Sequence, residues 1–381
     1  MTKRKVTLLA AADGTVAGQL AAIDGMLFSS SIRGVDLRTG RLADTQPGQV
    51  RAAFANLRGL LEKAGASADA IGLTTVSLAD PCLAPHVEEA WSALFAGQAH
   101  PPARKVNAYP LPNGDLVQIQ VVGVSGQKRQ SVAVPGLSAG KASGVRLGDM
   151  LFSSAIDGTD PATGRCAEDR KAQIRQAFRN MEALVAQAGG RKDDLAHIYL
   201  FIPGRDDQAD MLDVWLEEFP QDGNRPARKA IFDESVARES RVIYLLCIAV
   251  LGGGRRVNLE VPGISKRHPA PMGCRLGDFL VASGIGGDDP RGQETDKGIG
   301  VRSALAFENM RTLMTVAGGD LADIGFVSIL VNDYADEQEI LRQWRRMFPD
   351  PADEPARQLL AFGGRGSYPV QLHVMAASKR S

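Results

Sequence analysis

Three arginines occupy the same short sequence, Pro-Ala-Arg, at Arg104, Arg228 and Arg357. Arg228 follows Arg104 by 124 residues, and Arg357 follows Arg228 by 129. A guanidinium group is always charged and presents a planar fork of donors, which fits a carboxylate through two hydrogen bonds. Each arginine could therefore hold the carboxylate of a ligand, or pair with an acidic side chain of the protein and fix a domain boundary.

Other residues recur at the same two intervals, which indicates that the whole sequence around the arginines is repeated. A serine ends three matching runs, and a tryptophan precedes each arginine by 13 residues. These residues are Ser30, Ser154 and Ser283, and Trp91, Trp215 and Trp344. A period this long indicates three whole domains rather than a solenoid of short units. We predict domains at residues 1–131, 132–259 and 260–381.

Each repeat contains the same predicted elements, in the order β-β-α-β-α-β-β. In the first repeat the predicted strands are residues 6–11, 25–28, 71–78, 105–109 and 116–122, and the predicted helices are 49–63 and 86–95. Apolar residues at helical spacing define the helices, and β-branched residues mark the strand at 71–78. Two helices on one face of a mixed sheet make an α+β domain. Trp91 is expected to anchor the second helix on the sheet.

The predicted strands are apolar on both sides, so the sheet face without helices must also be covered. Packing three sheets around a common axis would cover it. Residues 134–138 and 261–265 open repeats two and three with near copies of one sequence, Val-Pro-Gly-Leu-Ser and Val-Pro-Gly-Ile-Ser. No low-complexity linker separates the repeats. We therefore expect three closely packed domains around a pseudo-threefold axis.

The composition is that of a neutral protein with enough apolar residues for a sizeable core. The chain has 381 residues, 44% of them hydrophobic, with 44 basic and 44 acidic side chains. Binding to nucleic acid depends mainly on clustered Lys and Arg, so we expect no nucleic-acid partner. The four cysteines form no C-x-x-C pair. We expect no disulfide framework, no metal site and no cofactor.

The first residues do not have the pattern of a signal peptide. Lys3, Arg4 and Lys5 precede an apolar run that Asp13 interrupts after about seven residues, which is short for that purpose. A first strand is the better interpretation. No segment approaches the roughly twenty apolar residues needed to span a bilayer. We expect a cytoplasmic protein without a membrane partner.

The ordered set of motifs resembles the RidA family, also called the YjgF proteins. The set comprises Gly-Asp-x-Leu-Phe-x-Ser, a turn such as Asp-Pro-Ala-Thr-Gly at 160–164, Ala-Phe-x-Asn, Ala-Gly and Pro-Ala-Arg. It covers nearly the whole chain, once per repeat. Members of this family are chorismate-mutase-like α+β domains that form homotrimers with ligand clefts between subunits. The resemblance implies a trimer fused into one chain, which acts as a monomeric pseudo-trimer or as a dimer of such chains.

The resemblance also implies roles for particular residues. In the family, the arginine of Pro-Ala-Arg binds the carboxylate of a small 2-imino or 2-oxo acid, and that role falls to Arg104, Arg228 and Arg357. The family's cleft-lining serine matches Ser30, Ser154 and Ser283. The alternative for these serines is a small residue where a strand packs tightly.

One family feature is missing from this sequence. The deaminases of the family place a glutamate on the last strand to position the attacking water, and the matching residues here are Gln120, Leu246 and His373. Glutamine can orient a water but cannot accept its proton, whereas histidine can. We predict His373 and Gln120 as catalytic residues, with Gln371 on the same strand face as His373 and in contact with substrate. The alternative for His373 is a hydrogen-bonded histidine within the sheet.

The predicted function is hydrolysis of a C–N bond in a small carboxylate, as in 2-iminobutanoate/2-iminopropanoate deaminases. The missing glutamate favours an alternative, a protein that binds small carboxylates or a partner without catalysis. A weaker alternative is a cyclic amide hydrolase with a serine–lysine pair. Lys105 and Lys229 directly follow two of the arginines and are predicted to point to the opposite sheet face. We expect the three clefts to differ chemically.

Overall fold

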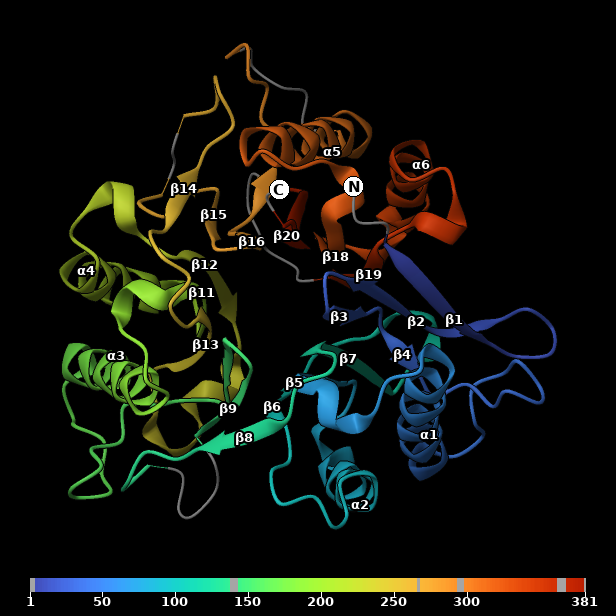
Figure 1. The fold of residues 1–381 in the computed structure, drawn as a ribbon, viewed down its shortest axis with the longest axis horizontal. Helices are drawn as coiled ribbons and strands as arrows, with labels where there is room; N and C mark the ends of the chain where they lie inside the picture. Colours follow the sequence, from blue (N-terminus) through green and yellow to red (C-terminus); the bar gives the residue numbers. More distant parts are fainter. Residues whose placement is uncertain (1–3, 138–142, 266–267, 293–297, 362–367, 380–381) are drawn as a thin grey trace.

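Three sheets, one from each repeat, share one strand order in the computed structural model of the chain (Figure 1). The structure describes residues 4–137, 143–265, 268–292, 298–361 and 368–379. In each sheet one edge pair is parallel, and the other paired neighbours run antiparallel. The predicted α+β class and the three tandem domains are confirmed.

The first sheet has the order β1-β2-β3-β7-β5-β6, with β4 paired to β7. Its elements are β1 (Lys5–Ala10), β2 (Val16–Ile23), β3 (Met26–Ser29), β4 (Ile32–Arg33), α1 (Gln46–Ala64), β5 (Ile71–Leu78), α2 (Ala84–Leu94), β6 (Ala103–Ala108) and β7 (Val117–Val124).

Repeats two and three follow the same plan, with the orders β8-β9-β10-β13-β11-β12 and β14-β15-β16-β20-β18-β19. Repeat two comprises β8 (Arg129–Val132), β9 (Gly144–Leu147), β10 (Met150–Ser153), α3 (Arg170–Gln187), β11 (Leu195–Ile202), α4 (Gln208–Glu218), β12 (Ala227–Phe232) and β13 (Tyr244–Val250). Repeat three comprises β14 (Val257–Leu259), β15 (Gly273–Leu276), β16 (Phe279–Ala282), β17 (Ile285–Gly286), α5 (Ile299–Val316), β18 (Ile324–Val331), α6 (Glu337–Met347), β19 (Ala356–Ala361) and β20 (Val370–Ala377).

Each repeat has an additional strand in its sheet before the first helix, and repeats one and three also have the two-residue strands β4 and β17, none of which the sequence predicts. The additional strands are β2, β9 and β15, each pairing with the strand before it and the strand after it. β2 is rich in Ala and Gly, which have weak strand propensity, and β9 and β15 span only four residues. Because these strands are short or rich in small residues, their sequences lack the hydrophobic alternation that predicts a strand.

The first helix of each repeat packs on one sheet face, and its ends are set by local residues. In α1, Thr45 accepts a hydrogen bond from Gly48 N, and Gly65 ends the helix with a positive φ of 70°. The buried face of α1 includes Val50, Phe54 and Leu57, as the spacing predicts. Trp215 and Trp344 anchor the second helices of their repeats in the core, whereas Trp91 is half-buried.

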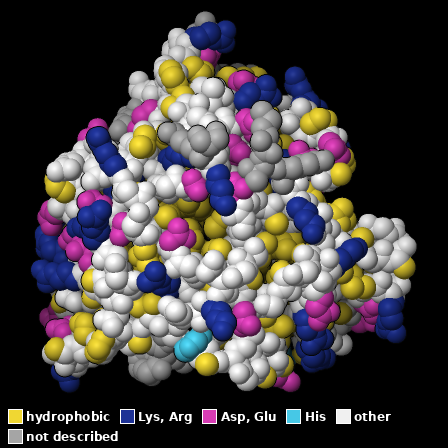
Figure 2. Space-filling view, viewed as in Figure 1, with side chains coloured by type: hydrophobic (Ala, Val, Ile, Leu, Met, Phe, Trp, Pro, Cys, Tyr) yellow, Lys and Arg dark blue, Asp and Glu magenta, His cyan; other side chains and the backbone are white. Residues whose placement is uncertain are grey.

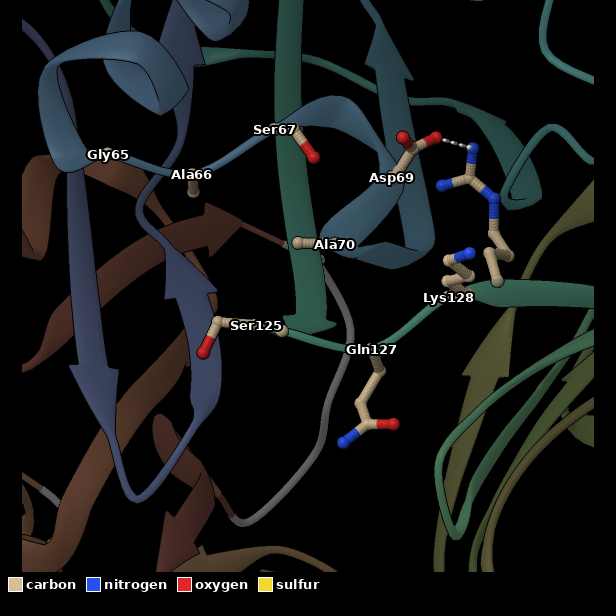
Figure 3. Close-up of a pocket in the computed structure, with 10 residues that line it drawn as sticks. Gly65, Ala66, Ser67, Asp69, Ala70, Ser125, Gln127 and Lys128 are labelled. Carbon is tan, nitrogen blue, oxygen red and sulfur yellow. Dashed lines mark ion pairs between the residues drawn. The ribbon is translucent and has the colours of Figure 1, made fainter.

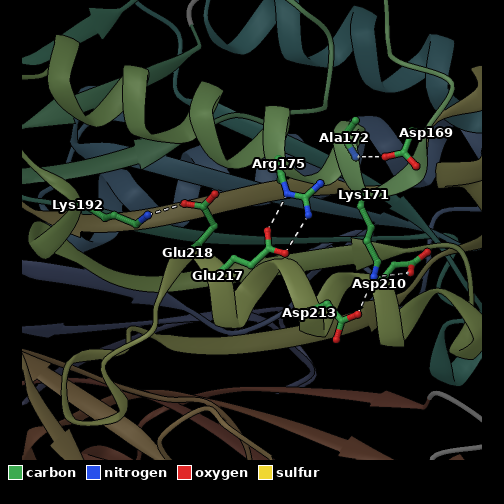
Figure 4. A network of polar contacts seen from close by, with 9 residues as sticks. All are labelled: Asp169, Lys171, Ala172, Arg175, Lys192, Asp210, Asp213, Glu217 and Glu218. Atoms are coloured by element: carbon green, nitrogen blue, oxygen red, sulfur yellow. Dashed lines mark hydrogen bonds and ion pairs between the residues drawn. The ribbon is translucent and has the colours of Figure 1, made fainter.

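The second helix packs beside the first on the outside of the molecule. In repeat two, ion pairs join α3 to α4, with Lys171 2.7 Å from Asp213 and Arg175 2.7 Å from Glu217 (Figure 4). These side chains are largely exposed, and exposed ion pairs contribute little to stability. The apolar faces of the helices therefore hold this layer on the sheet. No helix in the described part of the chain is both long and apolar enough to cross a membrane.

The sheet faces without helices meet in a central core made by all three repeats. Phe152 of repeat two packs where Gly72 of repeat one has no side chain: a Cβ on Gly72 would lie 2.3 Å from the Phe152 ring. Phe28 packs in the same way over Gly325 of repeat three, with a corresponding distance of 2.2 Å. The predicted arrangement, with sheets inside and helices outside, is present in the structure (Figure 1).

Three buried arginines, Arg4, Arg129 and Arg256, attach the start of each repeat to the preceding repeat around the ring. Arg129 donates to Ala68 O at 2.8 Å and to Ile71 O at 2.6 Å, and Arg256 donates to Asn224 O at 2.6 Å. Arg4 donates to Ile324 O, so the beginning of the chain is held by repeat three. We call these residues the anchor arginines. They close the ring without a covalent bond between its ends.

The anchor arginines also bear on the domain boundaries. β8 pairs with β9 of repeat two, and β14 pairs with β15 of repeat three. The predicted boundaries after residues 131 and 259 therefore cut through β8 and leave β14 outside its sheet. We propose boundaries immediately before Arg129 and Arg256.

Candidate functional site

Three equivalent junctions lie where the parallel edge of one sheet meets the next repeat. β6 contacts β10, β12 contacts β16, and β19 contacts β3. Each Pro-Ala-Arg arginine is the second residue of one of these edge strands. Each predicted serine directly follows the strand of the next repeat that contacts this edge strand. We call the sites cleft 1/2 (Arg104 and Ser154), cleft 2/3 (Arg228 and Ser283) and cleft 3/1 (Arg357 and Ser30). The site is therefore composite, with each half supplied by a different repeat.

Cleft 2/3 opens into a cavity of about 760 Å³. Its walls include Arg228 and Lys229 from repeat two and Ser283, Gly284 and Gln371 from repeat three. Three of the residues predicted to bind substrate, Arg228, Ser283 and Gln371, thus line one cavity. A space-filling view shows apolar side chains gathered in a hollow near the centre of the molecule, where the repeats meet (Figure 2).

Arg228 has an apolar and cationic environment. Its side chain lies 5.0 Å from the Trp215 ring, and Nη1 is 3.4 Å from Met211 Sδ. Arg228 is only 7% exposed, and burial lowers its pKa to about 10, with a smaller contribution from the charge of Arg225. The guanidinium stays charged at neutral pH. No carboxylate among the described residues pairs with it.

The other two motif arginines are already paired with carboxylates. Arg104 Nη2 lies 2.6 Å from Glu88 Oε1, and Arg357 Nη1 lies 3.3 Å from Glu354 Oε2. In repeat two the equivalent positions hold Leu212 and Arg225. The predicted alternative, an arginine paired within the protein, thus describes Arg104 and Arg357, while Arg228 alone of the three lacks such a partner within the described residues.

Lys229 reaches the same cavity as Arg228, although the two residues point to opposite faces of β12. β12 is the edge strand of its sheet, so the cavity extends around that edge to both faces. Lys229 Nζ donates to Gln371 Oε1 at 3.3 Å across the boundary between repeats. Arg228 and Lys229 thus point to opposite faces of the strand, as alternation predicts, and still line one cavity, because an edge strand does not separate the space on its two sides.

His373 lies on the same face of β20 as Gln371, but it is buried and does not line the cavity. His373 Nε2 is 3.1 Å from Nε2 of His197 in repeat two, so one neutral ring donates and the other accepts. Burial, together with His197 and the charge of Lys229, holds the pKa of His373 well below its usual value. Burial likewise lowers the pKa of His197 to about 3. We call His197 and His373 the histidine pair.

The predicted residues of cleft 3/1 make contacts within their own repeat. Gln120 is buried, and its Nε2 donates to Val121 O at 3.1 Å. Ser30 Oγ accepts from Gln19 N at 3.0 Å. Gln120 and His373 therefore belong to different clefts, and the catalytic roles predicted for them remain predictions.

In cleft 1/2 a different polar group faces Lys105. Lys105 Nζ lies 3.6 Å from Asp233 Oδ2 and 4.7 Å from the centre of the Phe201 ring. Burial lowers the pKa of Lys105, and the carboxylate of Asp233 opposes that shift. Ser154, the predicted serine of this cleft, is half-buried.

Sequence reasoning missed His197, the anchor arginines and Asp233. His197 aligns with Leu73 and Phe326, so no repeated histidine marks it. The anchor arginines do recur, at intervals of 125 and 127 residues, and that signal was available.

A second hollow, of about 670 Å³, lies beside an anchor arginine in repeat one (Figure 3). Its walls are mostly small residues, including Gly65, Ala66, Ser67 and Ala70, and Asp69 lies 3.8 Å from Arg129. Among the described residues no group of three or more His, Cys, Asp or Glu side chains could hold a metal ion. Cleft 2/3 is therefore the best candidate site.

Comparison with known proteins points to one family. A profile of the family described as Endoribonuclease L-PSP matches residues 16–125 and 138–242. The 2-iminobutanoate/2-iminopropanoate deaminase of Salmonella typhimurium is 36% identical over 90 residues, which are 23% of this chain and 70% of that protein. The TdcF protein of Escherichia coli strain K12 is 30% identical over 133 residues, 35% of this chain and 91% of that protein.

Solved structures of single domains are also similar. The YjgF gene product of Escherichia coli is 26% identical and has a TM-score of 0.29, covering 32% of this chain and 98% of its own. RidA from the Antarctic bacterium Psychrobacter is 24% identical with a TM-score of 0.30, covering 32% of this chain and 99% of its own. The profile alone matches more than half of the residues, and the chain belongs to the Endoribonuclease L-PSP family, that of the RidA and YjgF proteins.

Proposed function

We propose that cleft 2/3 binds a small carboxylate carrying a 2-imino or 2-oxo group, and that the protein hydrolyses the C–N bond of such an imine or enamine. The observation that carries this proposal is the state of Arg228, a buried charged group in a cavity with no carboxylate partner among the described residues. A buried charge is costly unless it is paired, so the site favours an anion from solution.

The surroundings of Arg228 favour a carboxylate further. Arg225 adds positive charge at the position where repeat three has Glu354. Guanidinium binds a carboxylate through two parallel hydrogen bonds, and low local polarity strengthens them. The similarity to an iminobutanoate deaminase indicates which carboxylates to test first.

The hydroxyl of Ser283 has a positioning role in this proposal. Ser283 Oγ accepts from Arg228 N at 3.0 Å and donates to Pro271 O at 2.6 Å. Its proton is directed at a carbonyl and not at a base, which argues against a serine nucleophile and hence against the cyclic amide hydrolase.

We retain His373 as the candidate general base of cleft 2/3 and Gln120 as a residue that orients water in cleft 3/1. His373 is neutral at neutral pH, the form that a general base requires, although its surroundings lower its pKa and it is not among the residues that line the cavity. We expect His373→Gln to lower turnover by about 100-fold or more while ligand affinity changes little. Unchanged turnover in this variant would remove His373 from the mechanism.

A second candidate function is binding without catalysis. It is favoured by the replacement of the family's glutamate in all three repeats, at Gln120, Leu246 and His373. The two functions are separated by generating a 2-imino acid in solution and measuring ammonia release with and without the protein. Binding without accelerated release would establish the second function.

The binding proposal is tested by soaking crystals with 2-oxobutanoate and by calorimetry in solution. We expect one molecule bound per chain, with its carboxylate on Arg228. Equal occupancy of all three clefts would contradict the assignment, because it would show that Glu88 and Glu354 do not compete with the ligand.

A further inference from the structure

We propose that cleft 2/3 selects a carboxylate whose side chain carries an aromatic ring, and that this ring lies along β12 between Arg228 and Phe232. This inference rests on the proposed function, because it takes the same 2-oxo or 2-imino acid in the same cavity and adds the class of its side chain. The cavity of about 760 Å³ lies in the range of pockets that hold drug-sized ligands, roughly 300–1,000 Å³. An acid of four carbons would leave much of this space to water.

Three residues on one face of β12, Arg228, Ala230 and Phe232, line the cavity in a row. At roughly 3.3 Å per residue, the Cα atoms of Arg228 and Phe232 are about 13 Å apart, with Ala230 halfway between them. The small side chain of Ala230 leaves space beside the arginine, and the large ring of Phe232 bounds that space at its far end. The row therefore presents a charged group, a gap and an aromatic wall.

The equivalent rows in the other repeats have the opposite order of sizes. Repeat one has Val106 and then Ala108 after its motif arginine, and repeat three has Leu359 and then Ala361. Val106 and Leu359 pack against the cores of their own repeats, so a bulky side chain occupies the place next to the arginine. Phe232, in contrast, is 39% exposed, so a ligand ring can pack against it.

Another part of the cavity wall has changed from charged to aromatic. At one pair of equivalent positions, repeats one and two have an ion pair, Arg33 with Asp115 at 2.8 Å and Arg241 with Asp157. Repeat three has Gly286 and Tyr368 at these positions, and both line the cavity. A Cβ on Gly286 would lie 2.8 Å from the ring of Tyr368, so the ring occupies the place of the missing side chain. Repeat three thus contributes an aromatic surface to cleft 2/3.

Arg205 favours an aromatic ring over an aliphatic chain in this space. Its guanidinium lies 5.7 Å from the centre of the Phe232 ring, and it lines the same cavity. Guanidinium groups stack on aromatic faces, and two aromatic rings attract each other in offset or edge-to-face arrangements. A ligand ring beside Phe232 would therefore gain from both neighbours. The positions equivalent to Arg205 are Pro81 and Tyr334, so this cation is specific to repeat two.

The experiment compares two acids that differ only by a phenyl group, 2-oxobutanoate and 2-oxo-4-phenylbutanoate, by calorimetry on the full chain. The ratio of their affinities isolates the ring, because both acids present the same carboxylate to Arg228. We expect the phenyl acid to bind about tenfold or more tightly, since burying an aromatic ring and packing it against another are both favourable. The 4-cyclohexyl acid has a ring without π electrons and should bind more weakly than the phenyl acid. Equal affinity for these two ring-bearing acids would overturn the aromatic assignment.

Three substitutions test where the ring binds. Phe232→Ala introduces the residue that both other repeats have at this position, and it should lower the affinity ratio about tenfold. Ala230→Leu introduces the residue of repeat three and should lower the ratio similarly, because it fills the gap. The fold already accepts both side chains at these positions. Leu216→Ala is the control, because it removes a comparably exposed apolar side chain that does not line the cavity, and it should leave the ratio unchanged.

The outcomes separate this proposal from the proposed function. Equal affinity for the phenyl acid and 2-oxobutanoate, with both weakened in Arg228→Met, would overturn the aromatic subsite and leave the carboxylate site in place. Binding of neither acid would overturn both. A ratio that is the same in the original protein, Phe232→Ala and Ala230→Leu would show that the ring binds elsewhere and would also overturn the subsite.

Discussion

Clefts 2/3 and 3/1 are built from the same strands of the same fold, yet they differ in charge and in packing. In cleft 3/1, Glu354 accepts from Arg357 at 3.3 Å and from Trp344 Nε1 at 2.7 Å, so the arginine is part of the framework. In cleft 2/3, Arg225 occupies the position equivalent to Glu354, and Arg228 has no carboxylate partner among the described residues. The comparison shows that carboxylates near the motif arginine, Glu354 in repeat three and Glu88 in repeat one, distinguish the paired arginines from Arg228; we propose that their replacement by Arg225 and Leu212 leaves Arg228 available for a ligand.

The packing beneath the two clefts differs as well. Phe28 fills the space over Gly325 beneath cleft 3/1, whereas the equivalent pair beneath cleft 2/3 is Val281 and Ala196. The large Phe28 side chain faces a glycine, whereas the smaller Val281 faces an alanine. The two side chains of each pair therefore fill a similar total volume. Each junction therefore fits its own pair of repeats, which a homotrimer with identical subunits cannot arrange.

The largest expected effect tests this packing. Phe28→Ala should lower the free energy of unfolding by about 3–5 kcal/mol, because it leaves a cavity over Gly325. Val281→Ala, the matched change at the other junction, should cost less because fewer buried atoms are removed. Urea unfolding followed by circular dichroism measures both. Equal losses would show that the two junctions are packed alike.

The next effect concerns the arginines themselves. Arg228→Met should weaken binding of 2-oxobutanoate by about 1.5–3 kcal/mol, the usual range for a hydrogen bond to a charged group. Arg104→Met and Arg357→Met should leave the affinity unchanged, since their guanidinium groups already have carboxylate partners. Calorimetry of the three variants ranks the clefts, and a loss with Arg357→Met comparable to that with Arg228→Met would reverse the assignment.

The sequence predicts part of the fold and part of the candidate site. The repeated motifs predict three α+β domains with the helices outside, and they name Arg228, Ser283 and Gln371 as candidate ligand-binding residues. The structure adds that these three residues line one cavity. Alternation along a strand predicts which residues share a face, but not which repeat faces them. Asp233 opposite Lys105, His197 opposite His373 and the access of Lys229 around an edge strand all depend on packing between repeats.

A third prediction uses the histidine pair, which is present only between repeats two and three. The folded protein lowers the pKa of both rings, so their contribution to stability is complete above the unfolded value of about 6.5 and is lost as pH falls below it. Each additional proton bound on unfolding costs about 1.4 kcal/mol of stability per pH unit. Urea unfolding at pH 7.5 and 5.5 measures the loss.

The matched control for that measurement replaces both rings with the residues of repeats one and two. In the double variant His197→Leu, His373→Leu, the first leucine matches Leu73 of repeat one and the second matches Leu246 of repeat two. This variant should lose less stability between the two pH values. An unchanged pH dependence in this variant would assign the acid sensitivity to other groups.

The smallest expected effect tests whether the charge difference can be transferred. Leu212→Glu places a carboxylate at the position of Glu88 and should weaken 2-oxobutanoate binding by about 1 kcal/mol, the scale of a partly exposed ion pair competing with the ligand. Leu212→Gln is the neutral control and should bind normally. If both variants bind like the original protein, Glu88 and its equivalents do not determine which cleft is available.

The anchor arginines help to close the three repeats of one chain into a ring. Two of the three joints in the ring are bridged by the chain, and the third is held by Arg4 together with the packing of Phe28 on repeat three. That third contact forms within one molecule, so its strength depends on an effective concentration set by the chain and not on the concentration of protein. A trimer of separate subunits dissociates on dilution, whereas this ring stays assembled at any concentration at which the chain is folded. The three repeats thus form a ring that non-covalent contacts close, and circular permutants that begin at Arg129 or Arg256 should assemble the same three clefts.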